Sequence, residues 1–383
     1  MRVTAMDPEY ILLTPGPLST SDTVRGAMNR DLSTWDADYN HIVQTIRQGL
    51  VAMLGGGDDT TSVLMQGSGT FGVEATIGTV VPPAGRLVVV NNGAYGARIL
   101  EIARRLEIPS IEARFAETEP ASAEHLDRLL TENPDTTHVA AVHCETTSGI
   151  LNPVELLGDV VAKHKMSFIV DAMSSLGGMP LTLDSLSADF VISSANKCIQ
   201  GVPGFSFVVA RRKALERCSG NSRSLSLDLY DQWAEMESHH GKWRFTSPTH
   251  TVLAFAQALE ELETEGGVTA RAERYTTNQQ QLVAGMVKIG FRPLLATSLQ
   301  SPIITSFHDP VANFDFARFY GLLKQHGFVI YPGKVTHADT FRIGNIGDVH
   351  PPDIERLLNA IAEVAELMSL FPTSTSPGDR TPG

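Results

Sequence analysis

The sequence predicts an α/β protein with a mostly parallel sheet, helices on both faces of that sheet, and a smaller α+β domain at the C-terminal end. Short segments rich in Val, Ile and Phe alternate with longer amphipathic segments over the N-terminal part of the chain. That alternation is typical of βαβ units. The short segments are continuously apolar, as expected of strands that are buried on both faces.

Polar or Gly-rich turns bound each predicted element. The predicted strands of the sheet are Ser62–Met65, Leu87–Asn91, His138–His143, Ser167–Asp171, Phe190–Ser194 and Phe205–Ala210. The helices predicted between them are Gly72–Thr79, Gly96–Leu106, Ala123–Thr131 and Pro153–His164. This order favours a doubly covered sheet over a sandwich or a helical bundle.

The pattern changes near residue 265. A long helical pattern, Thr249–Leu262, precedes Glu265-Gly266-Gly267, which we interpret as a hinge between domains. The predicted elements of the C-terminal domain are the strands Pro302–His308, Phe328–Tyr331 and Thr340–Ile343 and the helices Phe314–His326 and Pro352–Leu370. We therefore expect an N-terminal segment (1–20), a large domain (21–264), a small domain (265–370) and a disordered tail (371–383) rich in Pro, Ser, Thr and Gly.

Composition narrows the functional classes. The chain has 383 residues, enough for one large core and a smaller one, and its formal net charge of −13 argues against nucleic acid and anionic membranes as partners. Its three cysteines form no CxxC pair, which favours a reducing compartment over a disulfide framework. No secretory signal or transmembrane run is recognisable, so we expect a cytoplasmic protein.

The segment Gln66-Gly67-Ser68-Gly69-Thr70-Phe71 is the first candidate for ligand binding. It follows a predicted strand and opens a helix, and ligands of parallel α/β sheets bind at the carboxyl ends of strands. Glycines allow close backbone approach, helix N-terminal N–H groups bind phosphate, and Ser68 and Thr70 add hydroxyl donors. Taken alone, the segment is a weak signal, and the alternative is an ordinary strand-to-helix turn.

Asp171 is the second candidate. It ends the apolar run Phe168-Ile169-Val170, where a carboxylate could hold a pyridinium nitrogen in its protonated form. The alternative is a helix N-cap for Ala172-Met173-Ser174.

Lys197 closes the next predicted strand and precedes the turn Gly201-Val202-Pro203-Gly204. Lysines are seldom buried without a partner, and a nucleophilic lysine needs the lowered pKa that such a site supplies. The alternative is a solvated lysine. Together, a phosphate cradle, Asp171 and Lys197 supply the anchor, the ring-nitrogen partner and the amine that pyridoxal 5'-phosphate (PLP) chemistry needs.

Arg342, in Thr340-Phe341-Arg342-Ile343-Gly344, could clamp a carboxylate or a phosphonate with its planar fork. The alternative is a surface ion pair. We expect no metal site, because the adjacent His239 and His240 would point in different directions and no further ligand stands at metal spacing. His143 is expected to be a hydrogen-bonded core histidine.

These segments resemble the class V aminotransferases, PLP enzymes of fold type I, and the resemblance extends from Leu12 to about Leu367. Within the family, the chain most resembles the branch that acts on 2-aminoethylphosphonate and pyruvate. Ser194–Phe205 is the segment most specific for that branch. The other matching segments are Leu12–Leu18, Gln66–Glu74, Asn92–Gly96, His143–Pro153, Val170–Ser175, Ser226–Trp233 and Gly241–His250. Ala195 departs from the serine that is more usual in the family.

The resemblance implies roles for matching positions. Lys197 would hold the cofactor covalently, Tyr95 would stack on its ring, and Thr246 would reach the phosphate of the neighbouring subunit in a homodimer. Thr146 would hydrogen-bond the phenolic oxygen. The implied cofactor-binding residues are Ser68, Gly69, Thr70, Tyr95, Thr146, Asp171, Met173, Asn196, Lys197 and Thr246.

The implied reaction transfers the amino group of 2-aminoethylphosphonate to pyruvate, giving phosphonoacetaldehyde and L-alanine. Arg342 would hold the substrate anion, with Gly16 and Pro17 lining the substrate side. The alternatives are an alanine/serine–glyoxylate type of class V aminotransferase, a PLP lyase acting on the same phosphonate, and a phosphate-binding scaffold without chemistry. Intact Lys197 and Asp171 argue against the scaffold.

Overall fold

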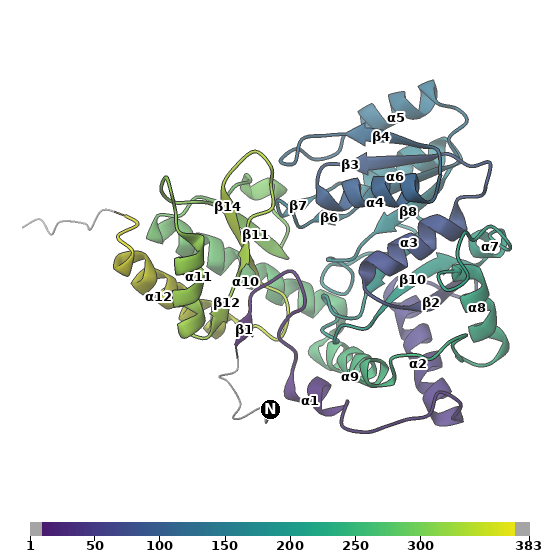
Figure 1. Ribbon diagram of the computed structural model, residues 1–383, viewed down its shortest axis with the longest axis horizontal. Helices are drawn as coiled ribbons and strands as arrows, with labels where there is room; N and C mark the ends of the chain where they lie inside the picture. The colour runs from purple at the N-terminus through teal and green to yellow at the C-terminus, as the bar shows by residue number, and fades with distance from the viewer. Residues whose placement is uncertain (1–9, 372–383) are drawn as a thin grey trace, which may run out of the picture.

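A seven-stranded sheet organises the larger part of the protein in the computed structural model, which describes residues 10–371 (Figure 1). The strand order is β2-β10-β9-β8-β5-β3-β4. Neighbouring strands are parallel except at β10, which runs antiparallel to both β2 and β9. The strands are β2 (Thr60–Gln66), β3 (Leu87–Asn91), β4 (Ser110–Arg114), β5 (His138–Val142), β8 (Ser167–Asp171), β9 (Phe190–Ser194) and β10 (Phe205–Arg211). The predicted fold class is confirmed.

The edge strand β4 was not predicted. Its sequence, Ser-Ile-Glu-Ala-Arg, has no apolar run, and only Ala113 is buried. A strand at the edge of a sheet is covered less than a central one, and charged side chains there prevent pairing with other chains. The continuous apolar pattern that identifies the inner strands is therefore missing at this position.

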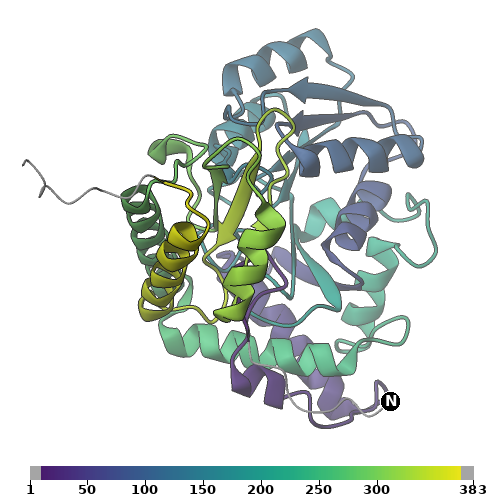
Figure 2. The same ribbon diagram turned by 60° about the vertical axis from the view of Figure 1, so that its left-hand side comes forward.

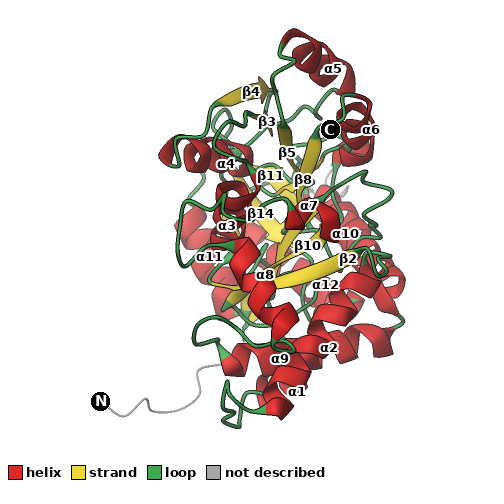
Figure 3. Cartoon of the chain, turned by 90° about the vertical axis from the view of Figure 1, so that its right-hand side faces the viewer, coloured by secondary structure: helices red, strands yellow, loops and turns green. Residues whose placement is uncertain are grey.

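Helices cover both faces of the sheet (Figure 3). The predicted helices correspond to α3 (Gly69–Val80), α4 (Ala94–Arg105), α5 (Ala123–Glu132) and α6 (Val154–Lys163). Every residue of α3 from Gly72 to Val80 is buried except Glu74, so this helix lies inside the domain, against β9 and β10. Before residue 249, the helices that were not predicted are α1 (Asp22–Gly26), α2 (Ala37–Met53), α7 (Arg212–Glu216) and α8 (Leu229–Ser238).

The C-terminal part has its own core. α9 (Thr249–Glu265) ends at Gly266, which has left-handed backbone geometry, and α10 (Gly267–Ile289) begins directly after it. α10 packs along α12 (Pro351–Leu367), as Figure 2 shows. The other elements are η1 (Thr297–Leu299), α11 (Phe316–Gln325) and an antiparallel sheet of β11 (Ile304–His308), β14 (Thr340–Gly344) and β13 (Tyr331–Pro332).

The N-terminal segment is held by the C-terminal part of the chain. The contact is the pairing of β1 (Ile11–Leu12) with β12 (Phe328–Val329). Separately, β6 (Cys144–Glu145) forms a hairpin with β7 (Ile150–Leu151). Residues 1–9 and the predicted disordered tail beyond Phe371 lie outside the described residues. None of the helices within residues 10–371 combines the length and apolar character that a membrane crossing requires.

Candidate active site

Lys197 lies three residues after β9, at the carboxyl end of the sheet. Its Nζ donates hydrogen bonds to the carbonyl oxygens of Pro15 at 2.9 Å and of Gly16 at 3.4 Å. Burial lowers the pKa of Lys197 from its usual 10.5 to about 8, although the nearby thiol of Cys198 and carboxylate of Asp171 act to raise it. A Cβ at position 16 would stand 2.6 Å from this Nζ, so the close approach requires a glycine there.

Asp171 ends β8, which lies beside β9 in parallel register. Its Oδ1 accepts a hydrogen bond from the N–H of Met173 at 2.9 Å, and no helix follows, so the helix-cap interpretation is wrong. The side chain is buried, and burial raises its pKa to about 6. An acid and an amine with opposite pKa shifts therefore lie at the ends of neighbouring strands.

In the turn from β2 into α3, the side chain of the N-cap residue does not cap the N–H groups at the start of the helix. Ser68 is the N-cap, but its side chain forms no capping hydrogen bond. A Cβ at Gly69 would collide with the side chain of Met173, which ties this turn to the residues after Asp171. The Thr70 hydroxyl accepts a hydrogen bond from Nη1 of Arg98 at 3.0 Å. The N–H groups of the first turn of α3, the hydroxyls of Ser68 and Thr70 and the guanidinium of Arg98 thus lie together at this turn.

Thr146 joins this cluster to the C-terminal part. Its buried hydroxyl has no hydrogen-bond partner among the described residues, which is unusual for a native buried polar group. Its carbonyl oxygen accepts a hydrogen bond from Nη1 of Arg342 at 2.8 Å. Arg342 also donates from Nε to the carbonyl of Pro332 at 2.9 Å, and its side chain is buried, so the surface ion pair considered for it is wrong.

Glu145 is not among the residues predicted for the site. This carboxylate is fully buried, and burial raises its pKa. It accepts hydrogen bonds from the backbone N–H groups of Tyr95 and Thr147, each at 3.0 Å. Glu145 therefore fixes the start of α4, where Tyr95 stands. The available signal was an acidic residue inside the segment His143–Pro153, without a charged neighbour to pair with it.

Tyr95 carries two cations near its ring. The guanidinium carbon of Arg98 lies 5.0 Å from the ring centroid, and the ammonium of Lys334 lies 4.4 Å from it. Neither cation was a sequence candidate. Arg98 lies three residues after Tyr95 on α4, within reach by helical spacing, whereas Lys334 comes from the connection between β13 and β14.

The remaining predicted residues lie as follows. Asn196 is half-buried and accepts a hydrogen bond from the Ser194 hydroxyl at 3.1 Å, and the carbonyl of Pro17 accepts one from Thr14. Thr246 is exposed in the connection between α8 and α9 and forms no hydrogen bond that would join it to the cluster within the described residues. The structure thus brings every predicted site residue to one place except Thr246.

His143 is a hydrogen-bonded core histidine, as predicted. Its Nδ1 lies 2.9 Å from the Ser175 hydroxyl, and burial lowers its pKa to about 4, so the ring is neutral. Between residues 10 and 371, no three His, Cys, Asp or Glu side chains are grouped to hold a metal ion.

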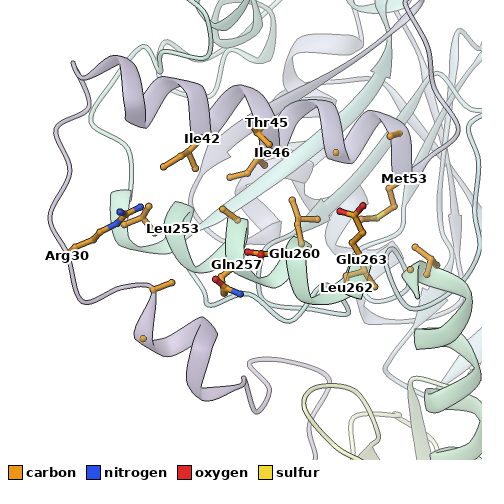
Figure 4. A pocket seen from close by; sticks show the side chains of 18 of the residues that line it. Arg30, Ile42, Thr45, Ile46, Met53, Leu253, Gln257, Glu260, Leu262 and Glu263 are labelled. Atoms are coloured by element: carbon orange, nitrogen blue, oxygen red, sulfur yellow. The ribbon is translucent and has the colours of Figure 1, made fainter. Parts of the chain in front are cut away.

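A groove of about 960 Å³ lies away from this cluster, between α1, α2 and α9 (Figure 4). Its walls are mainly aliphatic, with Ile42 and Ile46 from α2 and Leu253 from α9. None of the predicted site residues lines it, and it contains no cysteine or histidine. It offers a mainly apolar surface with Arg30, Glu260 and Glu263 at its walls, away from the predicted catalytic residues.

Comparison with known proteins identifies the family. Residues 4–341 match the model of the class V aminotransferases. The chain is 59% identical to the 2-aminoethylphosphonate–pyruvate transaminase of Vibrio cholerae, over 92% of this chain and 96% of that protein. It is 57% identical to the protein of the same name from Phocaeicola vulgatus, over 93% and 99%.

Solved structures agree with the fold. The ureidoglycine–glyoxylate aminotransferase of Bacillus subtilis superposes with a TM-score of 0.88 at 20% identity, covering 98% of this chain and 96% of that one. The pyridoxamine–pyruvate aminotransferase of Mesorhizobium loti superposes with a TM-score of 0.86 at 22% identity, covering 96% and 95%. The chain therefore belongs to the class V aminotransferase family.

Proposed function

We propose that this protein is a PLP-dependent transaminase that moves the amino group of 2-aminoethylphosphonate to pyruvate, giving phosphonoacetaldehyde and L-alanine. One observation carries the choice of substrates: relatives that are 57 to 60% identical over 92% or more of the chain bear the name of this activity. Lys197 and Asp171, at neighbouring strand ends, support the chemistry.

The residues of the cluster fit the cofactor. The start of α3, with Ser68 and Thr70, offers donors for a phosphate, and the unpartnered hydroxyl of Thr146 offers one for a phenolic oxygen. Asp171 offers a carboxylate for a protonated ring nitrogen, and Lys197 offers an amine for the covalent link. When bound, PLP supplies an electron sink for the charge left on the substrate carbon after its proton is removed.

Lys197 would carry the proton. When Nζ is free, its neutral amine would take the proton from the substrate carbon that bears the amino group. General acid–base catalysis is most effective when the pKa lies near the working pH, and burial brings the pKa of Lys197 to about 8. The carbonyl oxygens of Pro15 and Gly16 accept from Nζ and keep it close to the site.

Arg342 would bind the substrate anion. Its Nε and Nη1 each donate to a backbone carbonyl, which fixes the plane of the guanidinium. The N–H groups that remain can contact two oxygens of a phosphonate or of a carboxylate. One arginine can therefore serve both half-reactions, with Gly16 and Pro17 on the substrate side.

A half-reaction screen tests the proposed activity. We would add 2-aminoethylphosphonate, L-alanine or L-serine to the PLP-loaded protein without an amino acceptor and follow the absorbance change from the aldehyde to the amine form of the cofactor. 2-Aminoethylphosphonate and L-alanine should convert it. Conversion by serine but not by the phosphonate would favour the alanine/serine–glyoxylate alternative.

The lowered pKa of Lys197 predicts how cofactor loading depends on pH. Only the neutral amine forms the covalent link, and its share rises about tenfold per pH unit below the pKa and levels off above it. The rate of PLP capture by the cofactor-free protein should therefore rise from pH 6.5 and reach a plateau above about 8. Stopped-flow absorbance at fixed PLP measures this rate. A rise that continues to pH 10 would mean that Lys197 titrates as an ordinary exposed lysine.

We propose that the active site lies between a large domain, residues 21–264, and a small domain, 265–370, with the segment 1–20 beside it. The support is the separate core of the C-terminal part and the left-handed break at Gly266 between α9 and α10. Arg342 comes from the second domain and Lys197 from the first. Motion at Gly266 would then open and close the substrate site.

We also propose that the protein works as a homodimer with shared active sites. Large apolar side chains are exposed, including Trp35 at 80% and Phe245 at 50%, and such surfaces mark interaction sites. Phe245 and Phe71 line a pocket beside the Gln66–Gly67 turn that leads into α3, so a second copy covering them would also reach the phosphate site. The groove along α2, the helix that follows Trp35, would belong to the same interface.

Thr246→Ala tests the sharing of sites. Losing one hydroxyl donor to a phosphate should weaken PLP retention by about 1–3 kcal/mol, measured by dialysis and absorbance. In mixed dimers of a Lys197→Ala chain with a Thr246→Ala chain, shared sites would leave one site with both lesions and the other with neither. The intact site should retain PLP normally. One lesion in each site, with neither site intact, would place each Thr246 in its own subunit's site.

A cytoplasmic location completes the proposal. All three cysteines are free and buried, at positions 144, 198 and 218. Free thiols are typical of proteins in a reducing compartment.

A further inference from the structure

The phosphonate poses a charge problem that Arg342 alone does not solve. A phosphonate carries nearly two negative charges at neutral pH, whereas the carboxylate of pyruvate or alanine carries one. Arg342 supplies a single positive charge and already donates to the carbonyls of Thr146 and Pro332. The net charge of −13 adds no attraction. Discrimination in favour of the dianion requires a second cation close to this arginine.

The position of Lys334 makes it the candidate for this second cation. It lies in the connection between β13 and β14, and Tyr331 of β13 pairs directly with Arg342 of β14. The ammonium of Lys334 lies 4.4 Å from the ring centroid of Tyr95, a residue of α4 across the domain boundary. Lys334 therefore stands on the same hairpin as Arg342 and over the ring that is expected to stack on the cofactor.

The ammonium of Lys334 is available to a ligand. Among residues 10–371, it is in no ion pair with a carboxylate, and its side chain is half-buried. A cation over an aromatic ring gains about 0.5–1 kcal/mol at an exposed site and about 2 kcal/mol when desolvated, and Tyr95 and Lys334 are both half-buried. The flexible lysine stem can thus exchange the ring for an anion at small cost. Arg98, the other cation near Tyr95, is instead bonded to the Thr70 hydroxyl at 3.0 Å.

Glu117 of the large domain holds the connection that carries Lys334. Its Oε2 accepts hydrogen bonds from the backbone N–H of Thr336 at 2.8 Å, from the hydroxyl of Thr336 at 2.9 Å and from Nδ1 of His337 at 3.0 Å. Residues 333–339 are thereby fixed against the large domain close to Tyr95. This bridge gives Lys334 a defined place that its own side-chain contacts would not give it.

We propose that Lys334 is the second cation of the phosphonate site and selects the phosphonate dianion over carboxylate substrates, with residues 333–339 and Glu117 setting its position. This inference rests on the proposed 2-aminoethylphosphonate activity. In this arrangement, Arg342 binds the anionic group of either substrate, and Lys334 binds the additional negative charge of the phosphonate. Substitution of Lys334 should therefore change the ratio of the two half-reactions more than it changes the alanine half-reaction.

The test compares single-turnover half-reactions of the PLP-loaded protein with 2-aminoethylphosphonate and with L-alanine. Lys334→Gln should lower the second-order rate constant for the phosphonate about 10- to 100-fold, as for one charged hydrogen bond, and that for alanine less than about threefold. Lys334→Arg should restore most of the phosphonate rate. Methylphosphonate should lose potency against Lys334→Gln as a competitive inhibitor, while acetate should not.

Lys324→Gln is the matched control. Its ammonium also lies over a tyrosine ring, 5.1 Å from the centroid of Tyr10, but on the exposed surface of α11. It should leave both half-reactions unchanged. Equal losses for both donors in Lys334→Gln, or no loss, would overturn the inference. A wild-type protein that converts with alanine but not with the phosphonate would instead overturn the proposed function, independently of any Lys334 variant.

Discussion

Lys197→Ala is expected to abolish turnover while leaving the fold intact. The substitution removes the amine that would hold PLP covalently and the base that would move the substrate proton. Loss of proton transfer alone costs about 10²–10⁴-fold. Within residues 10–371, the Nζ of Lys197 donates hydrogen bonds only to the carbonyls of Pro15 and Gly16, so no described core contact depends on this charge. The variant should still bind PLP, but non-covalently.

Borohydride reduction followed by peptide mass mapping measures the covalent link directly. In the wild-type protein, the reduced cofactor should be found on the peptide that contains Lys197, and in Lys197→Ala on none. Lys163→Ala is the control, because Lys163, at the end of α6, is exposed and paired with Asp127 of α5, and it contacts none of the predicted site residues in the described part of the chain. A reduced cofactor on any other lysine of the wild-type protein would remove the centre of the proposed mechanism.

The sheet was predictable because its inner strands are buried on both faces. β3, β8 and β9 were predicted with the bounds that the structure has, since their apolar runs end sharply at polar residues. α10 was not predicted, although it is 23 residues long. Its buried set includes Arg271, Asn278 and Gln279, and these polar side chains hide its helical period from a pattern of apolar residues.

Arg271 and Arg274 show why such a helix folds at all. Both pair with Glu265, and their guanidinium groups donate to the carbonyls of Cys198 and Gly347. The two contacts with carbonyls each join residues 73 positions apart in the sequence. Burial of a paired arginine is a tertiary event, which a local sequence pattern does not report.

The site was predictable only from several residues taken together, and not from any one of them alone. Asp171 and Lys197 each had an ordinary alternative, and their shared position at the ends of parallel strands made the assignment. Lys334 and Glu117 were missed, because the contacts that place them, with Tyr95 and with Thr336, join segments far apart in the sequence. Glu145 was missed because it orients Tyr95 through a backbone N–H, which carries no side-chain signature.

Asp171→Asn is expected to separate folding from catalysis. The amide oxygen of an asparagine can accept the hydrogen bond that the Met173 N–H now donates to Oδ1, so the turn after β8 should persist. Burial has already raised the pKa of Asp171 to about 6, and the neutral side chain removes the cost of burying a charge. The melting temperature without cofactor should therefore be unchanged or higher.

Catalysis by Asp171→Asn should fall by about 10²–10³-fold, the range for losing one preorganised electrostatic group. A neutral amide cannot keep a ring nitrogen protonated, so the proton-transfer step slows while PLP remains bound through Lys197 and the start of α3. Single-turnover rates with 2-aminoethylphosphonate, together with cofactor content, distinguish the two effects. Asp189→Asn is the control, since Asp189 precedes β9 at the opposite end of the sheet and accepts a hydrogen bond from Ser167. Near-normal rates in Asp171→Asn would reduce Asp171 to a residue that only holds the turn at Met173.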